Sequence, residues 1–213
     1  VTSAPIQRTA SEILNISILQ GLSHPMQVVP YLVSLETSQD PILRSRAAQL
    51  HRHMMSKHAS LLASRYGECV RASFQFQCRL TSHPRGYRDG EQHAEALLQT
   101  WFDMLSEHRT ARLAFLKALV RLMDVTMGTT CTESDVNLAM YVADNLALLE
   151  YRVAEEPLLV IHELKMLHAV TGGQVMSMVT RKLRADDNQR SPSPLTDEEE
   201  EGDQYETGSD DDD

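Results

Sequence analysis

The stretch VVPYLVSLETSQDPILRSRAAQL, residues 28–50, decides the fold of this chain. Its first part is a run of apolar residues that contains Pro30, and a polar turn follows that ends at Asp40-Pro41. After the turn, apolar residues return at three- and four-residue spacing, which places them on one face of a helix. These positions are Leu43, Ala47, Leu50 and Met54. The stretch predicts two helices joined by a tight turn, with Pro30 at a kink or a helix start and Asp40-Pro41 at the start of the second helix.

The same periodicity continues along residues 1–185, which we call the body of the chain. Its further apolar positions are Ile13, Ile16, Leu19 and Leu22, then Ala94, Leu97, Leu98, Trp101 and Leu105, then Leu113, Leu116, Val120 and Met123, then Leu138, Tyr141, Val142 and Leu149, and finally Leu158, Ile161, Leu164 and Leu167. Short segments rich in Pro, Gly and polar residues separate these runs, and no period-two alternation occurs. We expect eight or nine helices of roughly 10–20 residues, and no strand.

Helices of this length joined by tight turns form either a closed bundle or a solenoid of stacked hairpins. Residues 28–50 resemble a HEAT repeat, in which a proline-containing helix leads to a turn with Asp, and an aliphatic–Arg pair opens the second helix. The resemblance implies an all-α HEAT-repeat solenoid of about four repeats, each roughly 40–47 residues long. The chain begins without Met, so we expect a longer array, with apolar side chains of the first helix exposed between Ile13 and Leu22.

Residues 186–213 differ from the body in composition. They hold thirteen Asp or Glu and one Arg, so the formal net charge of −10 comes from this tail, while the body is mildly basic. Because the tail offers little apolar surface to offset the entropy of ordering, we expect a disordered acidic tail. Ser191, Ser193 and Ser209 are candidate phosphorylation sites. The tail is expected either to compete with phosphate for a basic surface or only to keep the chain in solution.

Several classes of protein lack support in the sequence. No run approaches the roughly 18 apolar residues of a membrane-spanning helix. Three widely spaced cysteines, Cys69, Cys78 and Cys131, argue against a disulfide framework and favour a reducing compartment. Phosphate-binding, dinucleotide-binding, nucleophile-elbow and zinc-protease motifs do not occur, and no carboxylate or thiol completes a metal site with His51 and His53. The sequence predicts no enzyme, no cofactor, no metal and no membrane contact.

A basic segment is the most informative charge feature of the body. Residues 44–88 contain nine Lys or Arg and a single acid, Glu68. Such an excess favours contact with DNA through its phosphates, without readout of the base sequence. The predicted DNA contacts are Arg44, Arg46, Arg52, Lys57, Arg65 and Arg71.

Other interpretations of the basic segment stay open. The cations can form an ordinary solvated surface, with Arg44 tied internally to Asp40, or they can meet an acidic protein. Four basic residues also stand seven apart and would share one face of an unbroken helix, although we expect a turn near Ser56 to interrupt it. These four residues are Arg44, His51, His58 and Arg65.

A second resemblance extends over about residues 13–170. The segments that carry it are HP (24–25), VPYL (29–32), RSRA (44–47), KHA (57–59), PRGYR (84–88), RLAFL (112–116), YVADNLA (141–147), Tyr151, EEPL (155–158) and Ile161-His162. Their order and spacing resemble the C-terminal region of the Nipped-B-like sister-chromatid cohesion proteins, the cohesin loaders or adherins. The resemblance implies a non-catalytic, chromatin-associated scaffold in the nucleus that helps load cohesin onto chromatin and stimulates the cohesin ATPase.

The same resemblance implies particular partners. It implies contacts with the ATPase heads and kleisin subunit of cohesin and with double-stranded DNA, while a smaller loader subunit binds a region outside this sequence. A generic HEAT-repeat adaptor, whose basic face meets an acidic partner, is the alternative function.

The polar residues of the motif suggest a structural role. Asp144 and Asn145 stand in the middle of an apolar helix, where polar side chains need partners. We expect them to clamp a neighbouring turn, and the turn at Glu155-Glu156-Pro157 is the candidate. Glu155 and Glu156 suit a helix start because the helix dipole favours acids there, and Pro157 suits a first turn.

Overall fold

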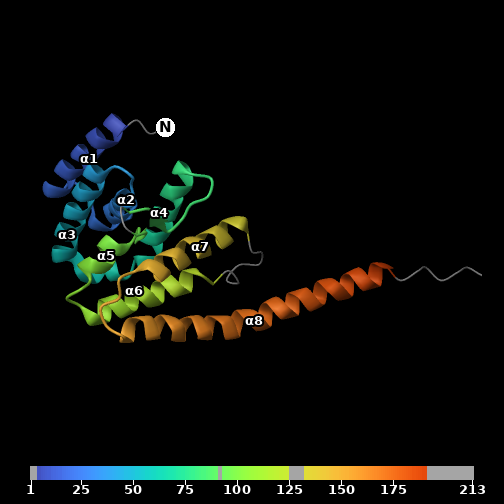
Figure 1. Cartoon of the computed structure of the whole chain (residues 1–213). Helices are drawn as coiled ribbons and strands as arrows, with labels where there is room; N and C mark the ends of the chain where they lie inside the picture. The colour runs from blue at the N-terminus through green and yellow to red at the C-terminus, as the bar shows by residue number, and fades with distance from the viewer. Residues whose placement is uncertain (1–3, 91–92, 125–131, 191–213) are drawn as a thin grey trace, which may run out of the picture. The chain divides into compact units, whose positions relative to one another are not determined.

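The computed structural model describes residues 4–90, 93–124 and 132–190. Within these residues the chain forms eight helices, in the expected range, and one short two-stranded ladder (Figure 1). The elements are α1 (Ala4–Leu19), α2 (Pro25–Glu36), α3 (Pro41–Ala63), α4 (Tyr66–Leu80), β1 (Tyr87–Arg88), β2 (Glu95–Ala96), α5 (Gln99–Met104), α6 (Arg109–Leu122), α7 (Glu133–Leu148) and α8 (Glu155–Arg190).

The α2–α3 hairpin confirms the prediction of two helices joined by a tight turn. The two helices pack against each other, and Asp40 caps α3, since its Oδ1 accepts the N–H of Ile42 at 2.9 Å. The predicted apolar face of α3 is buried at Leu43, Ala47, Leu50 and Met54. Pro30 does not begin a helix, because α2 begins at Pro25 and continues through Pro30, and the alternative of a kink at Pro30 stays a prediction. A proline at the first helical position supplies the start signal five residues earlier.

α3 does not run unbroken. At His58 the backbone leaves the helical region, with φ −136° and ψ 28°, two residues from the expected interruption at Ser56. Residues on either side of His58 therefore do not share one helical face.

The prediction that the chain contains no strand was wrong. β1 and β2 pair antiparallel, with Tyr87 opposite Ala96 and Arg88 opposite Glu95. The helix expected from Ala94 onward begins only at Gln99. Two-residue strands carry no periodicity of their own, and side chains from α7, about 50 residues later in the chain, hold this segment, as described below.

Aromatic side chains form the centre of the core in the described part of the body. Trp101 of the short helix α5 is fully buried, and His51, Tyr66 and Phe115 lie edge-on to it, with ring centroids 4.9–5.4 Å away. These three residues belong to α3, α4 and α6, so α5 joins three helices around one centre.

The outer face of α1 is apolar and exposed, as predicted. Only Ile18 of its large apolar residues is buried, and α1 packs on α3. The large apolar residues of α1 and the following turn that remain more than half exposed are Ile6, Ile13, Ile16, Leu19 and Leu22.

The chain divides into two compact units. One comprises residues 1–174 and the other residues 175–213, and the domain boundary expected after residue 185 stays a prediction. Within the second unit, α8 continues to Arg190, so residues 186–190 of the expected tail are helical. The rest of the tail, with Ser191, Ser193 and Ser209, lies outside the described residues. No described helix is both long enough and apolar enough to span a bilayer.

Candidate functional site

Arg44, the first predicted DNA contact, has internal partners. Its Nη1 donates to the carbonyl oxygens of Ser38 at 3.0 Å and Gln39 at 2.9 Å, which closes the turn after α2. The expected tie to Asp40 was wrong, because Asp40 instead accepts the Nε–H of Arg8 at 3.0 Å. Burial opposes ionisation of Asp40, but the hydrogen bonds from Ile42 and Arg8 hold its pKa below the usual value.

Two further predicted DNA contacts, Arg46 and Arg65, form ion pairs with acids of this chain. Arg46 Nη1 lies 3.0 Å from Glu12 Oε1 of α1, and Arg65 pairs with Glu68 one turn later. Both pairs are partly exposed, and such surface pairs contribute little to stability. A phosphate that approaches Arg46 or Arg65 must compete with a carboxylate.

Arg52, Lys57 and Arg71 are exposed, and no ion pair within the described residues involves them. Arg52 and Lys57 belong to α3, and Arg71 belongs to α4. Arg52 and Lys57 keep their whole charge available for an anion, whereas the charge of Arg71 also acts on Asp135 of α7 and helps to lower its pKa.

The four basic residues that stand seven apart in the sequence do not form one exposed surface. His51 is fully buried, and its Nδ1 lies 2.9 Å from Oε1 of Glu36, which is also buried. Burial of a polar side chain requires such a partner, and Glu36 at the end of α2 supplies it. The break at His58 agrees with the interruption expected near Ser56, and the burial of His51 removes a second member from any shared basic face.

The predicted DNA contacts lie at different hollows. Arg65 and Arg71, with Arg79, line a groove of about 990 Å³ between α2 and α4. Arg44 lines a pocket of about 690 Å³ with Arg85 and Arg88. The structure thus brings Arg65 and Arg71 together. Arg46 and Arg52 each line a further, separate hollow.

Asp144 and Asn145 of α7 hold the segment between α4 and α5. Asp144 accepts two hydrogen bonds from the Arg85 guanidinium, at 2.8 and 3.0 Å, and one from the Gly86 N–H at 3.1 Å. Asn145 Oδ1 accepts the Leu98 N–H at 2.9 Å. Burial opposes ionisation of Asp144, but Arg85 and Gly86 hold its pKa below the usual value. The suggested partner turn at residues 155–157 was wrong; the clamped segment is 85–98.

Gly86 is required where the clamp closes. A Cβ at this position would lie 2.0 Å from the carbonyl oxygen of Tyr141 and 2.5 Å from Asn145 Nδ2, so α7 leaves no room for a side chain. Close approach of two backbones explains why a glycine stands between Arg85 and Tyr87.

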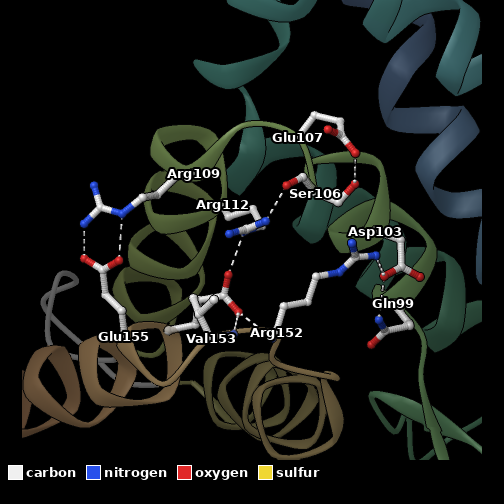
Figure 2. Close-up of polar contacts among 10 residues, drawn as sticks. Gln99, Asp103, Ser106, Glu107, Arg109, Arg112, Arg152, Val153 and Glu155 are labelled. Carbon is white, nitrogen blue, oxygen red and sulfur yellow. Dashed lines mark hydrogen bonds and ion pairs between the residues drawn. The ribbon is translucent and has the colours of Figure 1, made fainter.

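The acids at the start of α8 join it to α6, and Figure 2 shows the contacts around this point. Glu155 receives both arms of the Arg109 guanidinium. Glu156 is fully buried, 2.6 Å from Arg112 Nε, and its other oxygen accepts the N–H groups of Arg152 and Val153 at 2.8 and 3.4 Å. Such bonds satisfy backbone donors at a helix start.

The same network extends to α5. Arg152 Nη2 lies 3.3 Å from Asp103 Oδ1, and Gln99 Nε2 donates to that same oxygen at 3.0 Å (Figure 2). Arg112 also donates to the carbonyl oxygen of Ser106. Charged side chains therefore fix the first turn of α8 to α6, and Arg152, just before α8, to α5.

Sequence reasoning missed the partners Arg85, Arg109 and Arg112. Arg85 and Arg112 stand in segments that carried the family resemblance, but their acids lie 59 and 44 residues away, beyond any local spacing rule. These arginines can be matched with their acids only when it is known which helices are neighbours.

The geometry of the described residues bears on two chemical features, metal ligation and one buried thiol. No group of three His, Cys, Asp or Glu among them is placed to hold a metal ion. Burial raises the pKa of the Cys69 thiol to about 12, so it stays protonated and packs as an apolar side chain.

Comparison with known proteins identifies the family. The family model described as the sister chromatid cohesion C-terminus of Nipped-B matches residues 2–167. A human Nipped-B-like protein is 30% identical over 189 residues, which is 87% of this chain and 6% of that protein. The Nipped-B protein of Drosophila melanogaster is 24% identical over 84% of this chain and 9% of its own length.

A solved structure shares the fold. The C-terminal fragment of the cohesin loader SCC2 from Chaetomium thermophilum matches with a TM-score of 0.70 and 24% identity, over 78% of this chain and 12% of that one. The all-α solenoid expected from the sequence is therefore confirmed. The chain spans less than a tenth of the length of the human and fly relatives. Since the family model covers most of the chain, this protein belongs to the Nipped-B C-terminal family of sister chromatid cohesion proteins.

Proposed function

We propose that the chain serves as a scaffold segment of a cohesin loader, which helps load cohesin onto chromatin in the nucleus without catalysis of its own. Family membership and the likeness to a cohesin loader fragment support this role. The proposed partners are the ATPase heads and the kleisin of cohesin, whose ATPase the segment would stimulate, and DNA. A smaller loader subunit would bind outside this chain.

The observation that carries DNA contact is the set of exposed cations without a carboxylate partner in the described residues, Arg52, Lys57 and Arg71. A phosphate breaks no ion pair at any of the three, although the charge of Arg71 is shared with Asp135. Arg46 and Arg65 would contribute less, since Glu12 and Glu68 compete. Arg44 would contribute least, because two carbonyl oxygens already hold it.

A charge-reversal series tests DNA contact. Arg52→Glu, Lys57→Glu and Arg71→Glu are compared with Lys165→Glu on α8, an exposed cation outside the basic segment. Affinity for two unrelated duplexes of equal length is measured over a range of salt concentrations. Loss of one contact should weaken both duplexes equally and flatten the slope of log affinity against log salt by about one. Equal effects from Lys165→Glu would show that only net charge matters and would contradict the proposed contacts.

The groove between α2 and α4 favours a second candidate, an adaptor for an acidic protein. Exposed Tyr31 and the partly buried Met26 and Pro30 of α2 lie along it, opposite Arg71 and Arg79 of α4. A mixed apolar and cationic groove fits a peptide better than it fits a duplex. The same variants decide between the two functions: unchanged DNA affinity with reduced binding of cohesin would establish the adaptor and exclude DNA contact at these cations.

Stimulation of the cohesin ATPase is tested in the full-length loader. Arg52→Glu with Arg71→Glu should reduce the DNA-dependent ATPase rate of cohesin, whereas Lys165→Glu should leave it unchanged. A rate that no variant changes would exclude these cations from the stimulation.

A further inference from the structure

A second cationic pocket lies apart from the groove between α2 and α4. Its volume is about 690 Å³, and it is lined by the turn after α2, the C-terminal end of α4 and the segment that leads into β1. Three guanidinium groups share it, those of Arg44, Arg85 and Arg88. Residues with hydrogen-bonding side chains complete the lining, among them Ser38, Thr81 and His83.

The positive charge of this pocket is incompletely balanced. Asp144 neutralises Arg85 through a two-armed contact, but Arg44 binds only carbonyl oxygens and has no carboxylate within ion-pair distance in the described residues. Arg88 has Glu95 at 3.2 Å, a partly exposed side chain on the opposite strand. Exposed Asp89 is the one acid among the lining residues.

Arg88 has hydrogen-bonding capacity that its surroundings leave unused. Its side chain is mostly buried, its Nε is the atom that lies 3.2 Å from Glu95 Oε2, and its Nη1 makes no hydrogen bond within the described residues. Burial lowers the pKa of Arg88; the charge of Glu95 opposes this change, and the nearby positive charge of Arg44 adds to it. Two guanidinium groups that repel each other beside a pocket are the arrangement that a bound anion relieves.

We propose that this pocket binds a phosphate group carried by a phosphoserine or phosphothreonine of a partner protein. A phosphomonoester carries about −1.5 to −2 charges at pH 7 and three strong acceptor oxygens, which suits two guanidinium groups and neighbouring hydroxyls. A single phosphorylated side chain can enter a recess, whereas the backbone of a duplex is continuous and favours open surfaces such as Arg52 and Lys57. This site is independent of the proposed DNA contact, apart from Arg44.

The test uses the whole 213-residue chain and a labelled glycine-serine peptide with one phosphoserine, with its unphosphorylated twin as the reference ligand. Binding is followed by fluorescence anisotropy, and inorganic phosphate serves as the competitor. The phosphopeptide should bind saturably and at least about tenfold more tightly than its twin. Inorganic phosphate should displace it.

Matched variants locate the binding. Gln39→Glu places a carboxylate at the pocket and should weaken phosphopeptide binding about tenfold. Gln49 is an exposed residue of α3 outside this pocket, so Gln49→Glu should change the affinity less than about twofold. Asp89→Asn removes the one acid of the lining and should tighten binding. Arg88→Gln should abolish it. Gln39 and Asp89 are exposed, so their variants decide the question even if Arg88→Gln destabilises the chain.

Three results would overturn the proposal: equal affinity for both peptides, equal loss from Gln39→Glu and Gln49→Glu, or no tightening with Asp89→Asn. A fourth would replace it. If duplex DNA displaces the phosphopeptide and its own affinity falls with Gln39→Glu as strongly as that of the peptide, the pocket binds the DNA backbone instead.

Discussion

The cations of α3 and α4 differ from those of α6 that lie beside the start of α8. Arg52, Lys57 and Arg71 face solvent with no carboxylate partner in the described residues. Arg109 and Arg112, by contrast, each reach an acid of α8. The difference lies in the acids, which come from 44 to 46 residues further along the chain. The structural role of an arginine here depends on which element packs beside it.

The largest effect is expected from breaking the buried ion pair between Arg112 and Glu156. Arg112→Met leaves Glu156 buried without its cation and should lower the free energy of unfolding by about 3–5 kcal/mol in urea titration. Arg112→Met combined with Glu156→Gln, which keeps an acceptor for the N–H groups of Arg152 and Val153, should recover part of the loss. A double variant as unstable as the sum of the singles would show that the two residues act independently.

The clamp beside α7 should be nearly as sensitive. Gly86→Ala inserts a Cβ 2.0 Å from the Tyr141 carbonyl oxygen, so backbone must move, and stability should fall by about 3 kcal/mol. Gly173→Ala is the matched control, because no atom lies within 4 Å of its Cβ in α8, and it should stabilise by up to about 1 kcal/mol. Thermal unfolding measures both. Equal melting temperatures for the two variants would refute the close approach at Gly86.

Asp144→Asn should have a smaller, pH-dependent effect. At pH 7 it should cost about 1–2 kcal/mol, because Arg85 and the Gly86 N–H lose a charged acceptor. The pKa of Asp144 is lowered in the folded chain, so its contribution is complete above the unfolded value of about 3.9 and is lost as pH falls through the lower folded pKa. The difference in unfolding free energy between the two proteins should therefore narrow below about pH 4. A constant difference down to pH 2 would assign the effect to shape instead of charge.

The smallest effect is expected for the unpaired cations. Arg52→Met and Arg71→Met should change the free energy of unfolding by less than about 0.5 kcal/mol, because neither substitution breaks an ion pair of the described residues. A loss as large as that of Arg112→Met would mean that these residues hold the fold together and would remove the contrast between the two regions.

The sequence by itself determined the helical class and the hairpin at residues 28–50. Periodic apolar positions need only local geometry to select a face, and Asp40-Pro41 is a local signal for a helix start. The burial of Leu43 was predicted from the same helical periodicity, and the exposure of Ile13 and Ile16 from the expectation of a longer repeat array. The ordered motif segments also sufficed to indicate the family that residues 2–167 match.

Sequence reasoning chose the candidate site by charge density, and this criterion could not distinguish a free cation from a paired one. His51 looked like part of a basic row, yet Glu36 and Trp101 enclose it. Arg85 looked like one more surface cation, yet Asp144 binds it.

Only the tertiary structure decided these partners, together with the β1–β2 ladder and the pocket shared by Arg44 and Arg88. Each depends on side chains that lie tens of residues apart in the sequence. The energy of an ion pair or of a close backbone contact falls off within a few ångströms, so it depends on which elements the fold brings together. Local periodicity shows which face of a helix is buried. It does not show which neighbour covers that face.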